Sequence, residues 1–153
     1  MEIRTITETE RPEALELVWG TFLAFVAPDY PPQGVESFRA FLNSRDTMDA
    51  LEIAGAFEGG SLKGVIAVRD EGRHICLFFV RAASQGQGVG RRLWEYARDR
   101  CAHSAITVNA SPFAVPVYRR LGFQALGPEQ TVGGIRYTPM KYERPSPPAE
   151  REE

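Results

Sequence analysis

Three glycines stand within five residues, at Gly86, Gly88 and Gly90, directly before a segment with the apolar spacing of an amphipathic helix. Glycine weakens regular structure, so this cluster indicates backbone that must bend or approach a ligand closely. The preceding residues HICLFFV (74–80) are almost continuously apolar, as in a strand buried on both faces. A strand, a glycine-rich turn and a helix N-terminus form an anion site, because unpaired N–H groups face the turn. The segment therefore predicts a phosphate-binding loop.

Three phosphate-binding patterns can be compared with this segment. A P-loop needs lysine and then serine or threonine after its glycines, but here two arginines follow Gly90. The dinucleotide-binding fingerprint has Arg91 in place of its third glycine, and the strand lies too far along the chain for a first βαβ unit. The pattern Gln/Arg-x-x-Gly-x-Gly/Ala is matched by Gln85, Gly88 and Gly90.

This last pattern, together with NASPFAVPVYRRLGF (109–123), resembles the GCN5-related N-acetyltransferase (GNAT) superfamily, and the resemblance covers most of the chain. It implies an α/β fold with a mixed central sheet of about seven strands and about four helices. The sheet is expected to splay between its fourth strand, 74–80, and its fifth. The resemblance also implies transfer of the acetyl group of acetyl-CoA to a primary amine, with no metal.

The resemblance assigns a role to individual residues. The backbone of Phe79 and Val80 is expected to pair with the pantetheine arm of coenzyme A, and the loop from Gln85 to Arg91 to hold the pyrophosphate. Asn109 is expected to help hold the pantetheine, and Tyr118 to protonate the departing thiolate. The expected coenzyme A-binding residues are therefore Phe79, Val80, Gln85, Gly86, Gln87, Gly88, Val89, Gly90, Arg91 and Asn109.

Attack of a neutral amine on a thioester needs a polarised carbonyl and a proton for the leaving group. The N–H of Val80 can polarise the carbonyl, and the phenol of Tyr118 can supply the proton. No covalent intermediate is required, and the apolar settings of Cys76 and Cys101 favour reduced core thiols over a reactive thiolate.

The amine site and the general base are less clearly marked. Asp29, Tyr30 and Glu129 lie in two loops that correspond to the walls of the acceptor cleft in the family, so they are candidate amine contacts. His74 is a candidate base or water relay at the start of the fourth strand. No carboxylate is preferred as the base, and the acceptor stays open among polyamines, amino acids, antibiotics and peptide N-termini.

Each candidate also has a purely structural interpretation. Residues 85–90 can be a flexible connection, Tyr118 a residue at the edge of the core, and Asn109 a helix cap. His74 can be an ordinary turn histidine, and Arg91 a solvated helix residue. In function, the alternatives to an enzyme are a module that senses acyl-CoA without turnover and an interaction domain that retains only the fold.

The composition indicates one globular domain. The chain has 153 residues, of which 43% are hydrophobic and 25% charged, and we expect a single domain over 1–143 with a flexible tail over 144–153. The net charge of -2 gives no footprint for nucleic acid, and two histidines make a metal cluster improbable. Because the sequence shows neither a membrane span nor a signal peptide, we expect a cytoplasmic protein, and a homodimer is compatible with the family.

Apolar periodicity and turn residues predict the order of the elements. Pro116 is expected to delay the last helix or distort its first turn. The predicted strands are 2–7, 50–58, 61–70, 74–80, 105–109, 122–126 and 135–143, and the predicted helices are 11–26, 36–44, 89–101 and 111–123, with loops at 27–35 and 127–134.

Overall fold

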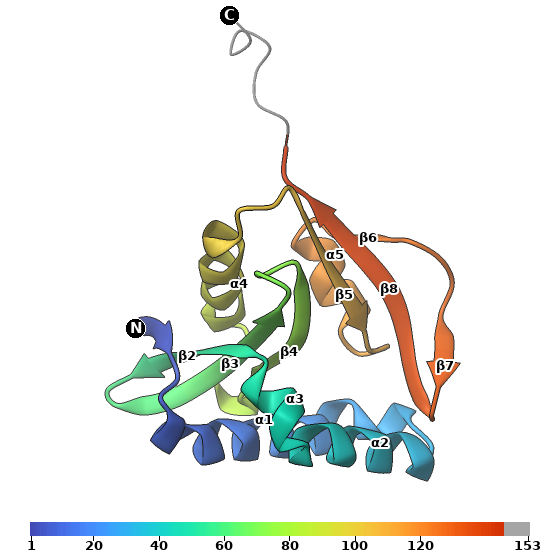
Figure 1. Ribbon diagram of the computed structural model, residues 1–153, viewed down its shortest axis with the longest axis horizontal. Coiled ribbons are helices and arrows are strands. Elements are labelled where there is room, and N and C mark those ends of the chain that lie inside the picture. The colour runs from blue at the N-terminus through green and yellow to red at the C-terminus, as the bar shows by residue number, and fades with distance from the viewer. Residues whose placement is uncertain (146–153) are drawn as a thin grey trace, which may run out of the picture.

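The computed structural model describes residues 1–145, which form eight strands and five α-helices (Figure 1). The strands are β1 (Glu2–Thr5), β2 (Glu52–Glu58), β3 (Ser61–Arg69), β4 (His74–Val80), β5 (Ala105–Ala110), β6 (Gln124–Ala125), β7 (Gln130–Val132) and β8 (Ile135–Glu143). The helices are α1 (Arg11–Phe25), α2 (Pro32–Asn43), α3 (Arg45–Asp49), α4 (Val89–Arg100) and α5 (Val115–Arg120).

The strands form a mixed sheet in the order β1-β2-β3-β4-β5-β8-β6, and β7 pairs with β8. Helices α1, α2 and α3 cover one face of the sheet, and α4 and α5 cover the other (Figure 1). Each face has its own apolar core: Leu17 and Val18 of α1 belong to the first, and Leu93 and Trp94 of α4 to the second. The predicted α/β architecture is therefore confirmed.

The sheet opens between β4 and β5, as predicted. These strands run parallel and pair only at His74↔Thr107 and Ile75↔Val108, so the later residues of β4 have no partner on that side. On the other side, β3 pairs Val68 with Ile75 and Ala67 with Leu77, which leaves Cys76 as an extra residue in a β-bulge. The splay and the bulge shape the centre of the sheet.

Several predicted boundaries differ from the structure. The expected loop over 127–134 contains β7, which forms a hairpin with β8, so the sheet has eight strands rather than seven. The expected loop over 27–35 is also partly wrong, because α2 already begins at Pro32. Proline suits the first turn of a helix, since the N–H that it lacks has no helical partner there. The short helix α3 was not predicted.

The last helix, α5, begins later than the predicted helix 111–123. Ser111 to Ala114 form a turn, with the N–H of Ala114 bonded to the carbonyl of Ser111 at 2.9 Å, and α5 starts at Val115. Pro116 thereby falls in the first turn of the helix. This is one of the two outcomes expected for that proline.

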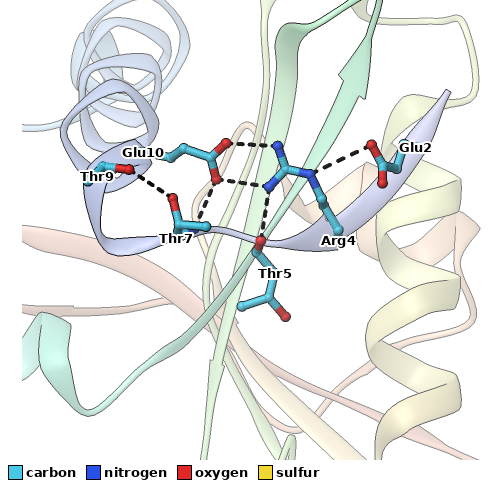
Figure 2. Close-up of polar contacts among 6 residues, drawn as sticks. All are labelled: Glu2, Arg4, Thr5, Thr7, Thr9 and Glu10. Atoms are coloured by element: carbon cyan, nitrogen blue, oxygen red, sulfur yellow. Dashed lines mark hydrogen bonds and ion pairs between the residues drawn. The ribbon is translucent and has the colours of Figure 1, made fainter.

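The first strand is tied to the start of α1 by an ion pair (Figure 2). Two guanidinium nitrogens of Arg4 donate to the Glu10 carboxylate at 2.9 and 2.8 Å, and the N–H of Thr7 donates to the same carboxylate at 2.9 Å. The Arg4 guanidinium also lies 4.0 Å from the centre of the Phe57 ring. These bonds lower the pKa of Glu10 to about 2, with the Arg4 hydrogen bond as the main cause.

The described part of the expected tail begins with an anchored residue. The Arg144 guanidinium donates to the carbonyls of Arg98 at 3.0 Å and Cys101 at 2.9 Å, at the end of α4. The rest of the predicted tail, residues 146–153, lies outside the described residues. Within residues 1–145, none of the helices combines the length and the apolar character that a membrane crossing requires.

Candidate functional site

A cavity of about 790 Å³ lies where β4 and β5 part. Its lining draws on both faces of the sheet: Phe38 and Phe79 belong to the side covered by α1 to α3, whereas Phe78 and Tyr118 belong to the side covered by α4 and α5. The cavity therefore passes through the opened sheet, and a molecule bound on one side can meet a molecule bound on the other.

The free edge of β4 presents alternate backbone groups to this cavity. The N–H of Arg81 bonds to the carbonyl of Lys63 at 2.9 Å, and the pairing alternates from there back along β4. Phe79 therefore directs its N–H and carbonyl toward β3, whereas Phe78 and Val80 direct theirs into the gap. The expectation that the Phe79 backbone faces the ligand is wrong by one residue, because the N–H and carbonyl of Phe79 pair with β3. The Phe79 side chain still lines the cavity.

Two residues of the glycine loop, which we define as 85–91, adopt a left-handed backbone. Gly86 has φ 78° and Gly88 has φ 87°, and a Cβ at either position would meet no atom within 4 Å. Backbone conformation, rather than space, accounts for glycine at these two positions. Gly88 is the N-cap of α4, and the first helical bond runs from Arg92 N–H to its carbonyl at 3.1 Å. The N–H groups of the three residues between them, 89–91, have no helical partner.

The residues of the loop divide into those that line the cavity and those that do not. Gln85, Gly86, Gly88, Gly90 and Arg91 line the cavity. The cavity lining does not include Gln87, whose side-chain amide donates to the carbonyl of Ala83 at 3.2 Å, or Val89, whose side chain is in the core at 3% exposure. Val89 can therefore serve a ligand only through its N–H.

Asn109 and Gln85 lie on opposite edges of the opening. Asn109 is exposed near the end of β5 and lines the cavity. The Gln85 side-chain amide donates to the carbonyl of Val80 at 3.0 Å, which fixes the turn that leaves β4. Val80 directs its N–H and its carbonyl into the gap. Gln85 binds the carbonyl, so the N–H remains available to a ligand.

Tyr118 is buried beside the exposed edge of β4. Its ring centre lies 5.8 Å from that of Phe78 and 5.1 Å from that of Phe123, and the residue is 4% exposed. Burial raises the pKa of the Tyr118 phenol far above its usual value, so the hydroxyl stays protonated throughout the ordinary pH range. Tyr118 is part of the cavity wall.

His74 is held in one tautomer by a chain of hydrogen bonds. The Thr107 hydroxyl donates its single proton to the carbonyl of Arg73 at 3.2 Å, and the same oxygen lies 2.8 Å from His74 Nδ1. Thr107 must therefore accept a bond from Nδ1–H, which leaves the lone pair on Nε2. Burial lowers the pKa of His74, and the nearby Arg69 charge lowers it further. The ring is thus neutral near pH 7 and lines the cavity with a free basic nitrogen.

The three loop candidates for amine contact have different environments. Tyr30 lines the cavity, but its hydroxyl already donates to the carbonyl of Arg136 at 3.1 Å, and burial raises its pKa to about 12. Asp29 and Glu129 do not belong to the lining. The carbonyl of Asp29 accepts a bond from Arg136 at 2.9 Å, and the carboxylate of Glu129 pairs with the same guanidinium at 2.7 Å.

The comparisons with known proteins decide the family. A sequence model of the acetyltransferase (GNAT) domain matches residues 26–144, which is most of the chain. The chain belongs to the GNAT family. No curated protein sequence matches it significantly.

Solved GNAT structures share the fold at low sequence identity. The GCN5-related N-acetyltransferase from Rhodopseudomonas palustris has a TM-score of 0.80 at 17% identity, covering 93% of this chain and 94% of that chain. PaiA N-acetyltransferase from Thermoplasma acidophilum, in complex with coenzyme A, has a TM-score of 0.74 at 17% identity, covering 93% and 98%. An aminoglycoside 6'-N-acetyltransferase complexed with coenzyme A has a TM-score of 0.61 at 13% identity, covering 97% and 100%.

The cavity of this GNAT protein fits the features of coenzyme A. An extended chain of amides can pair with the outward groups of Phe78 and Val80, as an added strand would. Phosphate oxygens can accept the unpaired N–H groups at the start of α4, and Arg91 adds a positive charge there. In the described chain, no group of three or more His, Cys, Asp or Glu side chains is arranged to hold a metal ion.

The opposite side of this GNAT cavity is aromatic, and sequence analysis missed most of it. We call it the aromatic half, and the part formed by Phe78, Val80 and 85–91 the glycine-loop half. The aromatic half consists of Phe22, Phe25, Tyr30, Phe38, Phe41, Phe79 and Phe113. The phenylalanines of α1 and α2 lie on the apolar faces of these helices, so from sequence alone they are read as ordinary core residues. The signal that could have found them is the density of aromatic residues on two adjacent helices.

The prediction that Cys76 is a core residue is partly wrong. The sequence placed it in the core, but it occupies the bulge of β4, is half-buried and lines the cavity. Both cysteines are free, and Cys101 is buried as expected. Burial raises the pKa of the Cys76 thiol, which disfavours the thiolate.

Proposed function

We propose that this GNAT protein transfers the acetyl group of acetyl-CoA to a primary amine by direct attack of the amine. The observation that carries the proposal is that one cavity contains the free edge of β4, the glycine loop and the buried Tyr118. Each is a feature that thioester aminolysis needs: binding of an extended cofactor, binding of phosphate, and a proton for the leaving group.

Acetyl-CoA supplies the activated acetyl group, and the backbone of β4 and the glycine loop hold it. Tyr118 packs against Phe78, so we assign polarisation of the carbonyl to the N–H of Phe78. The N–H of Val80, which the sequence favoured, is two residues further along, or roughly 7 Å at the usual rise of a strand. The role of Val80 is then to bind the extended arm.

Tyr118 is the general acid in this proposal. Its raised pKa keeps the proton on the phenol until the leaving thiolate develops. The leaving sulfur would develop its charge in the same apolar surroundings, where burial disfavours the thiolate and so favours its uptake of the proton.

His74 is the general base in this proposal, and it acts through intervening water, because it lies four residues before Phe78 on β4, or roughly 13 Å at the usual rise of a strand. The attacking nitrogen must lose a proton, and Nε2 of His74 has a free lone pair because Thr107 and Arg73 fix the other tautomeric position. Among the described residues that line the cavity, none is an aspartate or a glutamate. His74 is therefore the neutral base that the cavity offers near pH 7.

Calorimetric titration with coenzyme A and acetyl-CoA, followed by a thiol-release assay with a panel of amines, tests the proposal. Saturable one-to-one binding together with amine-dependent thiol release is the expected result. Binding without thiol release for any amine would contradict the enzyme and favour an acyl-CoA sensor. Absence of binding by the folded protein would contradict both and leave only the fold.

A further inference from the structure

We infer that the acceptor is a small primary amine attached to an aromatic or other apolar group, without a second positive charge. The inference rests on the proposed function and adds the class of substrate. The aromatic half would bind the apolar group, while the amine faces the centre of the opened sheet, where the two sides of the cavity meet.

The rings of the aromatic half form two contacting groups, one in the interior and one at the mouth. Phe22 stacks on Phe38 with ring centres 4.1 Å apart, and Phe38 lies 6.1 Å from Phe79 on β4. Toward the surface, Phe25 stacks on Phe113 at 5.1 Å, so α1 contacts the turn before α5. Exposure rises from 1% at Phe22 to 41% at Phe113. Aromatic rings therefore line this side from the interior to the mouth of the cavity and offer an apolar group a largely apolar surface.

The hydroxyls of this side are already engaged. Tyr30 donates to the carbonyl of Arg136 at 3.1 Å, and Ser37 donates to the carbonyl of Gly133 at 2.6 Å. Gly34 approaches Gly134 so closely that a Cβ on either would overlap the other's backbone. These contacts close the β7–β8 hairpin onto α2, and they leave few groups to bind a polar substituent on the substrate.

The charges around the cavity oppose a polycation. Within the described chain the charged lining residues near pH 7 are Arg69, Arg91 and Arg120, and all three are positive. Glu129, close to this side, pairs with Arg136, and Glu36 lies 3.3 Å from Arg39. A second ammonium would lose its hydration without gaining a carboxylate, which is unfavourable. Polyamines and aminoglycosides are thus poor acceptors, whereas the reacting amine is neutral when it attacks.

The test uses the protein saturated with coenzyme A, which has no acetyl group to transfer. Calorimetry then measures binding of 2-phenylethylamine and of 1,4-diaminobutane to this complex. We expect 2-phenylethylamine to bind at least ~10-fold more tightly, since burying even one methylene in an apolar pocket discriminates by about that factor. Equal or tighter binding of the diamine, or no binding of either amine, would overturn the inference.

An exposed residue at the mouth allows a switch of preference. Phe113→Asp adds a carboxylate to the aromatic half at a position that is 41% exposed, so the fold should tolerate it. We expect this variant to bind 2-phenylethylamine at least ~5-fold more weakly and to bind the diamine more tightly. Leu126→Asp, at a 59% exposed position outside the cavity, is the matched control and should change neither affinity. A Phe113→Asp variant that retains both wild-type affinities would overturn the inference.

Thiol release with acetyl-CoA separates the inference from the proposed function. If 2-phenylethylamine binds preferentially but releases no thiol, the substrate class holds for a binding protein and the enzyme proposal fails. If thiol release occurs and is faster with the diamine, the enzyme proposal holds and the substrate class is wrong.

Discussion

The two halves of the cavity are built from different kinds of groups, one mainly from backbone and the other from side chains. The glycine-loop half uses mainly backbone: left-handed Gly86 and Gly88, the first N–H groups of α4 and the free edge of β4. The aromatic half uses side chains from α1, α2, β4 and the turn before α5. A cofactor that never changes can be bound by backbone, whereas the side chains that bind an acceptor can change without altering the fold. The comparison predicts that variants in the two halves have separate effects.

The largest expected effect is at the glycine loop. Gly88→Val places a β-branched residue at φ 87°, so the loop should lose its shape and coenzyme A affinity should fall by ~100-fold or more, as expected for the loss of two charge-assisted hydrogen bonds. Gly60→Val is the matched control, because Gly60 has φ 81° and open space but lies in the β2–β3 turn. Calorimetry should show normal binding for the control. Equal coenzyme A affinity of both variants would contradict the role of the glycine loop in binding the cofactor.

Tyr118→Phe tests the point where the halves meet. The ring contacts with Phe78 and Phe123 remain, so the thermal midpoint and coenzyme A affinity should change little. Loss of the proton donor should lower kcat by ~100-fold. Tyr142→Phe removes a hydroxyl outside the cavity and should retain full activity. An unchanged kcat for Tyr118→Phe at every pH would remove the general acid from the proposal.

His74→Gln is expected to affect the acceptor side alone. Proton transfer by a positioned base contributes ~100-fold or more, so kcat/KM for the amine should fall by about that factor while coenzyme A binds normally. Because burial lowers the pKa of His74, wild-type activity should lose its His74-dependent step only below about pH 6.5, and the variant should lack that inflection. His103→Gln is the control, since His103 is partly exposed and bonded to Glu71 at 2.9 Å. An inflection that persists in His74→Gln would assign it to another group.

The smallest effect is expected far from both halves, at the pair in Figure 2. The Glu10 pKa of about 2 lies below its ordinary 4.5, so the stability it contributes is present above pH 4.5 and is lost as the pH falls toward 2. Glu10→Gln should lower the thermal midpoint only slightly at pH 7, because water screens this exposed pair, and the difference should vanish as the pH falls below about 2. Coenzyme A affinity at pH 7 should not change. Thermal unfolding followed by circular dichroism across this pH range measures the effect.

The fold was largely predictable because its signals are local. The continuous apolar run of β4 and the apolar spacing in α4 each act within one element. The errors fall where local signals conflict. Proline and glycine in 27–35 and 127–134 suggested loops, but α2 starts at a proline, and β7 forms because β8 provides a partner for its backbone groups. Pairing of that kind is not visible within three residues.

Register was the other source of error at the site. Whether Phe78 or Phe79 directs its backbone into the gap depends on its pairing with β3, and the bulge at Cys76 shifts that pairing by one residue. Nothing in the types of these residues records the shift. Assigning the wrong one of two adjacent residues is therefore the expected form of failure in a strand.

The sequence by itself determined the family, the strand–loop–helix unit and the loop 85–91, because that loop is contiguous and two of its positions need a backbone that only glycine adopts readily. Only the tertiary structure decided the aromatic half, the side of His74 that carries its lone pair, and the burial that keeps Tyr118 protonated. These properties arise from contacts between residues far apart in the chain. A side chain's packing partners, hydrogen-bond acceptors and exposure to water exist only after the elements have come together.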